Sequence, residues 1–100
     1  MKYNKLIRDK IPDIIKRSGG NPIIHIANGS EYLEKLNEKL KEEVSEFINE
    51  NNEEELVDIL EVINVIYEFN KFNKKKLEIL RKEKSDERGK FNKRIILEKT

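Results

Sequence analysis

Two stretches of apolar residues recur at the period of an α-helix, and this repeat limits the fold more than any other feature of the chain. The first, in residues 30–48, places its apolar side chains on one stripe: Leu33, Leu36, Leu40, Val44, Phe47 and Ile48, and residues 49–52 form a polar connection after it. The second, in residues 53–72, is apolar on two sides: Leu56, Ile59, Leu60, Ile63 and Tyr67 on one, and Val62, Val65, Ile66 and Phe69 on the other. We therefore predict two long helices, the second of which is buried on two sides.

The size of the chain bears on what covers the second helix. A chain of 100 residues forms one small domain, here residues 1–100. A domain of this size rarely encloses a helix completely, so we expect one side of residues 53–72 to contact another copy of the chain. The sequence therefore predicts a homodimer or a tetramer, without deciding between the two.

Capping residues mark where these helices begin. Pro12 suits the first turn of a short helix that ends at about Arg17. Ser30 is a suitable N-cap for the first long helix, and Asn52 for the second.

The remaining elements are a third long helix and two short strands. The helix is expected over residues 77–87, where it is ended by Gly89 and faces inward through Leu77 and Leu80. Residues 23–27 and 94–98 have the pattern of short strands, and two isolated strands in a helical protein usually pair. The predicted fold class is thus mainly α, an antiparallel helical bundle with a small two-stranded β element.

Composition excludes several classes of protein. Charged residues make up 41% of the chain but the net charge is only +1, so bulk charge does not favour binding to a nucleic-acid polymer. Cysteine is absent, which excludes disulfides and thiolate metal sites. No apolar run approaches the roughly 20 residues that span a membrane, and the N-terminal residues have no hydrophobic signal core. A cytoplasmic protein with no membrane partner is the expectation.

Two acidic pairs at helical spacing carry the functional signal. Glu43 and Glu46 lie three residues apart in the first long helix, and Glu55 and Asp58 do so in the second. Residues three apart on a helix share a face, with Cβ atoms roughly 5–6 Å apart. Adjacent antiparallel helices would bring the four carboxylates together, and a divalent cation would offset their repulsion. Oxygen ligands without thiols or imidazoles favour Mg²⁺, with Mn²⁺ as the alternative.

An ordinary reading of the same acids is also open. The chain has 20 acidic residues, so pairs at this spacing arise by chance, and they recur at Glu31/Glu34, Glu50/Glu53 and Glu83/Asp86. Glu55 fits a capping box with Asn52, and Glu43 and Glu46 fit a solvated helix edge on the flank of the apolar stripe. Asp58 is harder to explain this way, because it interrupts an apolar run, and an unpaired buried carboxylate is costly.

With these pairs placed, the chain resembles the MazG-like all-α nucleotide pyrophosphohydrolases, a superfamily that includes phosphoribosyl-ATP pyrophosphohydrolase and the dimeric dUTPases. The shared signature, Glu-x-x-Glu on one helix and Glu-x-x-Asp on the next, is matched by residues 39–47 (KLKEEVSEF) and 54–60 (EELVDIL). Residues 3–12 (YNKLIRDKIP) and 84–91 (KSDERGKF) resemble flanking motifs of one subgroup of small proteins, although Lys90 stands where a second glycine is usual.

The resemblance implies a function and a set of site residues. A nucleoside triphosphate would be cleaved between its α and β phosphates, giving a nucleoside monophosphate and pyrophosphate. Glu43, Glu46, Glu55 and Asp58 would hold Mg²⁺, and Glu43 or Glu46 would act as general base. Candidate cations for the substrate phosphates are Arg8, Lys10, Lys84 and Arg88.

Two alternatives remain beside a stand-alone enzyme that removes unwanted nucleotides. One is hydrolysis of phosphoribosyl-ATP in histidine synthesis, which the segment at residues 8–12 makes the less favoured choice. The other is a non-catalytic helical module that binds a partner through the two-sided second helix, with the acids as ordinary surface. The sequence does not identify the nucleotide or the number of metal ions.

Overall fold

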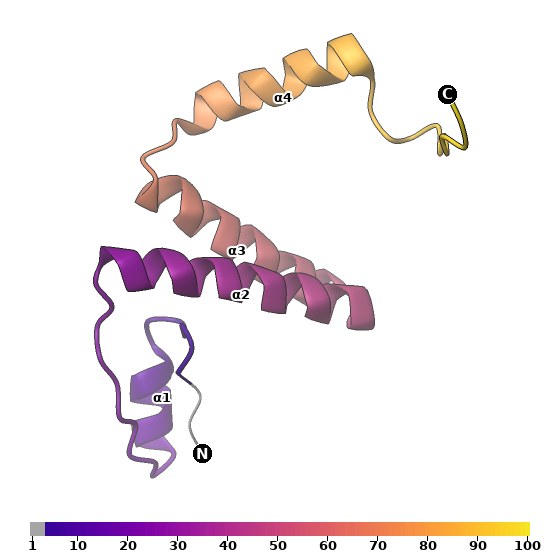
Figure 1. The fold of residues 1–100 in the computed structure, drawn as a ribbon. Helices are drawn as coiled ribbons and strands as arrows, with labels where there is room; N and C mark the ends of the chain where they lie inside the picture. Colours follow the sequence, from indigo (N-terminus) through magenta and orange to yellow (C-terminus); the bar gives the residue numbers. More distant parts are fainter. Residues whose placement is uncertain (1–3) are drawn as a thin grey trace. The chain divides into compact units, whose positions relative to one another are not determined.

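The structure, a computed structural model, describes residues 4–100, which contain four α-helices (Figure 1). They are α1 (Ile11–Arg17), α2 (Gly29–Glu50), α3 (Glu53–Phe69) and α4 (Lys74–Arg88). The contacts divide the chain into two units, of which the first runs through Ile66 and the second is Tyr67–Thr100. The predicted mainly α class is confirmed, and none of the described helices has the length and apolar character needed to cross a membrane.

Asparagine N-caps set the start of the three longer helices. The side-chain oxygens of Asn28, Asn52 and Asn73 each accept a hydrogen bond from the backbone N–H three residues later, at 2.9, 3.0 and 3.1 Å. Asn52 was predicted as a cap, whereas the prediction of Ser30 for α2 is wrong. Asparagine caps as well as serine does, and Asn28 has the extended backbone of a capping residue, so α2 starts two residues earlier than predicted.

A two-residue connection joins α2 to α3. Asn51 ends α2 in the left-handed conformation (φ 50°, ψ 47°), and its N–H donates to the carbonyl of Phe47 at 2.7 Å. Asparagine tolerates this conformation better than most residues. The next residue, Asn52, already caps α3, so the chain reverses at once and α2 and α3 run antiparallel side by side (Figure 1). Leu36 of α2 and Val62 of α3 are the buried hydrophobic residues of this unit.

In the second unit, α4 is longer than the helix predicted over residues 77–87. It begins at Lys74 because Asn73 provides a cap, and it ends as predicted at Gly89, whose φ of 86° suits glycine. Leu77 is half-buried but Leu80 is 48% exposed, so the expectation that both face inward is correct for Leu77 alone.

The predicted pairing of residues 23–27 with residues 94–98 is wrong, because the described part of the chain contains no strand. Residues 23–27 belong to the first unit and residues 94–98 to the second. Ile23 is 95% exposed, and Arg94 has a φ of 58°, which breaks the extended backbone a strand needs. Both segments thus have the apolar pattern of a strand, but neither pairs with a second strand among the described residues. A two-stranded ribbon alone is also marginal in water.

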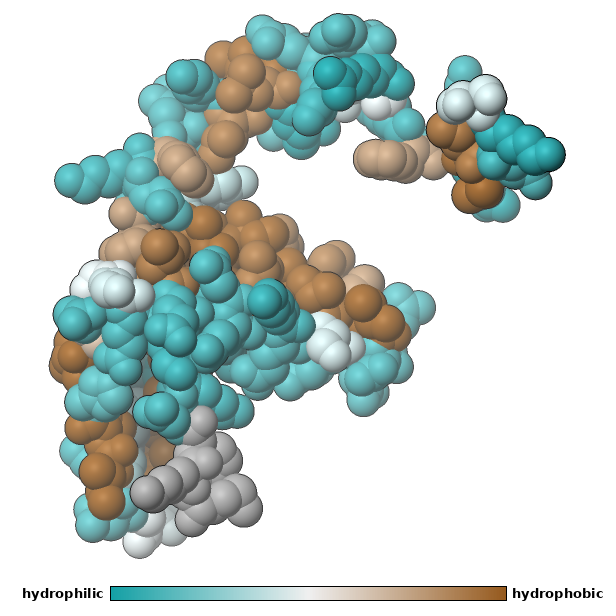
Figure 2. Space-filling view, viewed as in Figure 1, coloured by the Kyte–Doolittle hydropathy of each residue, from teal (hydrophilic) through white to brown (hydrophobic). Residues whose placement is uncertain are grey.

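An apolar band follows α3 on the surface of the first unit (Figure 2). Leu56, Val57 and Leu60 are between 45% and 58% exposed there. Buried and exposed apolar residues therefore occur on the same helix, and the predicted burial of its second side against another copy of the chain stays a prediction. The exposed side of α3 in the first unit thus presents apolar side chains to solvent.

Leu36 and Leu33 provide a matched test of where the core lies. Leu36 is 1% exposed and Leu33 is 41% exposed on the same helix. We expect Leu36→Ala to lower the free energy of unfolding by about 2–5 kcal/mol, because it leaves a cavity, and Leu33→Ala to cost clearly less. Urea unfolding followed by circular dichroism measures both, and equal losses would contradict this assignment of the core.

Candidate metal centre

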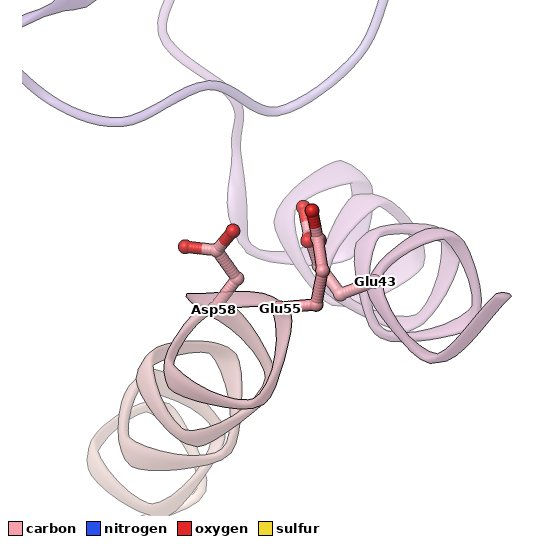
Figure 3. Close-up of side chains that lie close together, drawn as sticks. All are labelled: Glu43, Glu55 and Asp58. Atoms are coloured by element: carbon pink, nitrogen blue, oxygen red, sulfur yellow. The ribbon is translucent and has the colours of Figure 1, made fainter. Parts of the chain in front are cut away.

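Three carboxylates from α2 and α3 meet on one side of the helix pair (Figure 3). Glu43 comes from α2, and Glu55 and Asp58 come from α3. One carboxylate oxygen from each residue lies within 4.8 Å of those of the other two. The antiparallel hairpin therefore brings together three of the four acids that the sequence singled out.

Glu43 is the buried member of the cluster. The residue is 6% exposed, although its place on the flank of the stripe had suggested contact with water. Its Oε1 forms an ion pair with Lys39 Nζ, one helical turn earlier, at 3.2 Å. Its Oε2 is buried without a hydrogen-bond partner. A buried acceptor without a partner is costly, so this atom has unused capacity to bind a cation.

Glu55 is half-buried, and its Oε2 is likewise buried without a hydrogen-bond partner. Burial raises the pKa of its carboxyl group above the ordinary 4.5, and a hydrogen bond with Glu46 raises it further. The negative charges of Glu46, Asp58 and Glu43 act in the same direction. Burial, the hydrogen bond with Glu46 and crowding by like charges thus favour the protonated form of Glu55.

Glu46 lies at the edge of this group. It is exposed to solvent and reaches Glu55 through the hydrogen bond that raises the Glu55 pKa, but it is not one of the three acids whose oxygens converge. The predicted set of four ligands is therefore arranged as three converging carboxylates with a fourth beside Glu55.

Asp58 is paired and accessible, which differs from the burial expected for it. Its side chain is 37% exposed, and its Oδ1 accepts a hydrogen bond from Arg8 Nη2 at 2.7 Å. The carboxylate buried in the helix interface is that of Glu43 instead. Arg8, which was predicted to bind phosphate, lies directly beside the cluster.

The donor set fits a hard divalent cation. Mg²⁺ binds oxygen ligands at about 2.0–2.1 Å, so opposite ligands stand about 4 Å apart. The three oxygens all lie within 4.8 Å of one another, which is close to that spacing. The buried oxygens of Glu43 and Glu55 have no hydrogen-bond partner, and both could supply negative charge to such an ion once Glu55 has lost its proton.

The other predicted phosphate-binding residues lie in different places. Lys10 is exposed at the start of α1, in the same unit as the carboxylates. Lys84 and Arg88 are exposed on α4, in the second unit. Their contact with substrate stays a prediction.

Sequence reasoning missed three features of the site. The burial of Glu43 was readable from its position seven residues after Leu36 and four before Phe47, which places it on the apolar stripe. The ion pair with Lys39 follows from their spacing of four residues. The link between Arg8 and Asp58 spans 50 residues, and no local pattern indicates it.

Comparison with known proteins leaves the family open. No family model matches the chain, and no solved structure matches it. An uncharacterized protein of Mycolicibacterium smegmatis is 45% identical over 42 residues, which is 42% of this chain and 43% of that protein. The match thus spans less than half the length of this relative.

The raised pKa of Glu55 predicts how stability depends on pH in protein treated with a chelator. The folded state keeps this proton at a pH where the unfolded state has lost it, so Glu55 lowers stability as the pH rises above about 4.5. Glu55→Gln cannot ionise. The variant should therefore gain stability relative to the wild type as the pH rises, measured by urea unfolding between about pH 4 and pH 8.

Glu54→Gln is the matched control, since Glu54 is exposed on the same turn of α3. A plot of its free energy of unfolding against pH should stay parallel to that of the wild type. If the stability of Glu55→Gln also followed that of the wild type across this range, a raised pKa of Glu55 would be ruled out.

Proposed function

We propose that this chain is a Mg²⁺-dependent nucleoside triphosphate pyrophosphohydrolase that converts unwanted nucleotides to the monophosphate and pyrophosphate. The observation that carries the proposal is the convergence of Glu43, Glu55 and Asp58, with buried oxygens of the first two left without partners. Structural ion pairs usually satisfy buried carboxylates, so this arrangement favours a cation site over an ordinary acidic surface.

The carboxylates would hold the ion jointly. Glu43, Glu55 and Asp58 are the nearest set, and Glu46 stands beside Glu55 as the fourth. Mg²⁺, or Mn²⁺ in its place, would neutralise charge that develops on the phosphates when bound. Lys39 holds one oxygen of Glu43, which fixes that side chain within the helix interface.

Glu46 is the better candidate for general base. Glu43 is buried and has one oxygen engaged by Lys39, whereas Glu46 is exposed to solvent. A base must reach a water molecule and accept its proton as the water oxygen bonds to phosphorus and the bridging P–O bond breaks. Solvent access therefore favours Glu46 for this role.

Cations are needed to offset repulsion between the acids and a triphosphate. Arg8 lies at the cluster, and Lys10 follows it in the same N-terminal segment. A guanidinium group can bind a phosphate through two parallel hydrogen bonds. Lys84 and Arg88 lie on α4 of the second unit, and only the sequence resemblance supports them as phosphate ligands.

Hydrolysis of phosphoribosyl-ATP remains the alternative within the same reaction class, because the carboxylates do not distinguish nucleotides. A panel of normal and modified triphosphates assayed beside phosphoribosyl-ATP would name the substrate. A non-catalytic helical module is the second alternative, and the exposed apolar band of α3 favours it. That module predicts neither stabilisation by Mg²⁺ nor release of pyrophosphate.

Asp58→Asn tests the metal centre directly. Replacing this ligand should lower Mg²⁺-dependent pyrophosphate release at least about 100-fold, since even outer-shell changes cost 10–100-fold at metal sites. Helical circular dichroism should stay close to that of the wild type. The control is Glu34→Gln, which removes one negative charge from an exposed position of α2 and should keep activity. Full activity in Asp58→Asn would rule out the assigned site.

We also propose that the chain forms a homodimer or a tetramer through α3. Leu60 is 58% exposed within the apolar band, and a charged side chain there would be buried on association. Leu60→Lys should therefore shift sedimentation at micromolar concentration toward the monomer. Lys82→Glu, at an exposed position of α4, should leave the assembly unchanged. A wild-type chain that sediments as a monomer would contradict the proposal.

A further inference from the structure

The segment at residues 4–10, called here the N-terminal arm, is anchored by its apolar residues and exposes its charged ones. Leu6 and Ile7 are half-buried, whereas Arg8 is exposed. The carbonyl of Arg8 accepts a hydrogen bond from the N–H of Ile11 at 3.1 Å, which forms the turn into α1. The position of Arg8 is thus set both by packing before it and by the turn after it.

The arm makes ion pairs with both helices of the hairpin. Lys5 Nζ lies 3.4 Å from Glu42 Oε1 on α2, and Arg8 Nη2 lies 2.7 Å from Asp58 Oδ1 on α3. These contacts join residues 37 and 50 positions apart in the chain. The arm therefore binds the two elements that carry the convergent carboxylates.

The Arg8 contact engages one of the proposed metal ligands. A guanidinium group and a divalent cation are both attracted to the same carboxylate, and like charges disfavour their close approach. The side chains of Arg8 and Asp58 are 56% and 37% exposed, so water screens the pair and its net strength is modest. A contact of this strength can be exchanged for a metal ion.

We infer that Arg8 competes with the divalent cation for Asp58, so that metal binding releases Arg8 from the carboxylate and makes its guanidinium available to an anionic substrate. This inference rests on the proposed function. It assigns Arg8 two partners in succession, Asp58 first and the substrate phosphates afterwards. By linkage, a phosphate that engages Arg8 should also strengthen metal binding, because both events draw Arg8 away from Asp58.

The change in metal affinity when Arg8 is removed distinguishes competition from phosphate binding alone. If Arg8 opposes the ion, its removal should tighten metal binding when no nucleotide is present and weaken nucleotide binding when metal is saturating. If Arg8 only binds phosphate, its removal should leave the affinity for metal alone near that of the wild type.

The experiment measures binding of Mn²⁺ alone to chelator-stripped protein, by electron paramagnetic resonance of the free ion, with Mg²⁺ as competitor. Arg8→Gln should lower the dissociation constant about two- to fivefold, the range that an exposed ion pair supports. Arg8→Lys keeps the charge, and its dissociation constant should lie between those of Arg8→Gln and the wild type. The control is Lys16→Gln, which removes the same charge from an exposed position on the last turn of α1 and should shift the affinity less.

A second readout is the steady-state kinetics of nucleotide hydrolysis at saturating Mg²⁺. Arg8→Gln should raise KM for the nucleotide more than it lowers kcat. Equal Mn²⁺ affinities for wild type, Arg8→Gln and Lys16→Gln would overturn the competition and leave the proposed reaction standing. Tighter Mn²⁺ binding by Arg8→Gln without turnover of any nucleotide would support the competition and overturn the proposed reaction. An absence of Mn²⁺ binding in every variant would overturn both.

Discussion

Repulsion among the carboxylates of α2 and α3 is the interaction on which the rest of the first unit depends. Packing the hairpin brings Glu43, Glu55 and Asp58 together, so the apolar contacts of Leu36 and Val62 must hold the helices against this charge. The chain offsets part of the repulsion with Lys39 on the same helix and Arg8 from the N-terminal arm. Oε2 of Glu43 and Oε2 of Glu55 are buried without hydrogen-bond partners, and these two oxygens are the chemical basis of the proposed site.

The four acids differ in how their negative charge is offset by neighbouring cations, and they differ in environment as a result. Glu43 is held in the interface by a lysine one turn away, while Asp58 faces water and an exchangeable arginine. Glu55 has neither of these two cations and favours its proton. Glu46 remains open to solvent. One cluster thus contains an acid held by a lysine, an acid paired with an exposed arginine, an acid that favours its proton, and a solvent-accessible acid beside them.

Local patterns predicted the helices and the meeting of three of the four acids because both depend on short-range rules. The periodicity of the two apolar stretches gave α2 and α3, and Asn52 and Gly89 marked helix ends through their own backbone preferences. The strands failed because residues 23–27 and 94–98 need a distant partner that a local pattern cannot supply. The Arg8–Asp58 pair was missed for the same reason, since 50 residues separate its members. Glu43 was misplaced because an acid on an apolar stripe was assigned to its flank.

The two-asparagine turn between α2 and α3 has a consequence for how the chain folds. All three convergent acids lie within residues 43–58, so they meet as soon as this one hairpin closes, and no distant segment needs to arrive first. Contacts of such short range cost little loop-closure entropy. The repulsion is therefore built into the hairpin itself, and we expect a cation that lowers it to favour closure of the hairpin as well as to stabilise the folded chain.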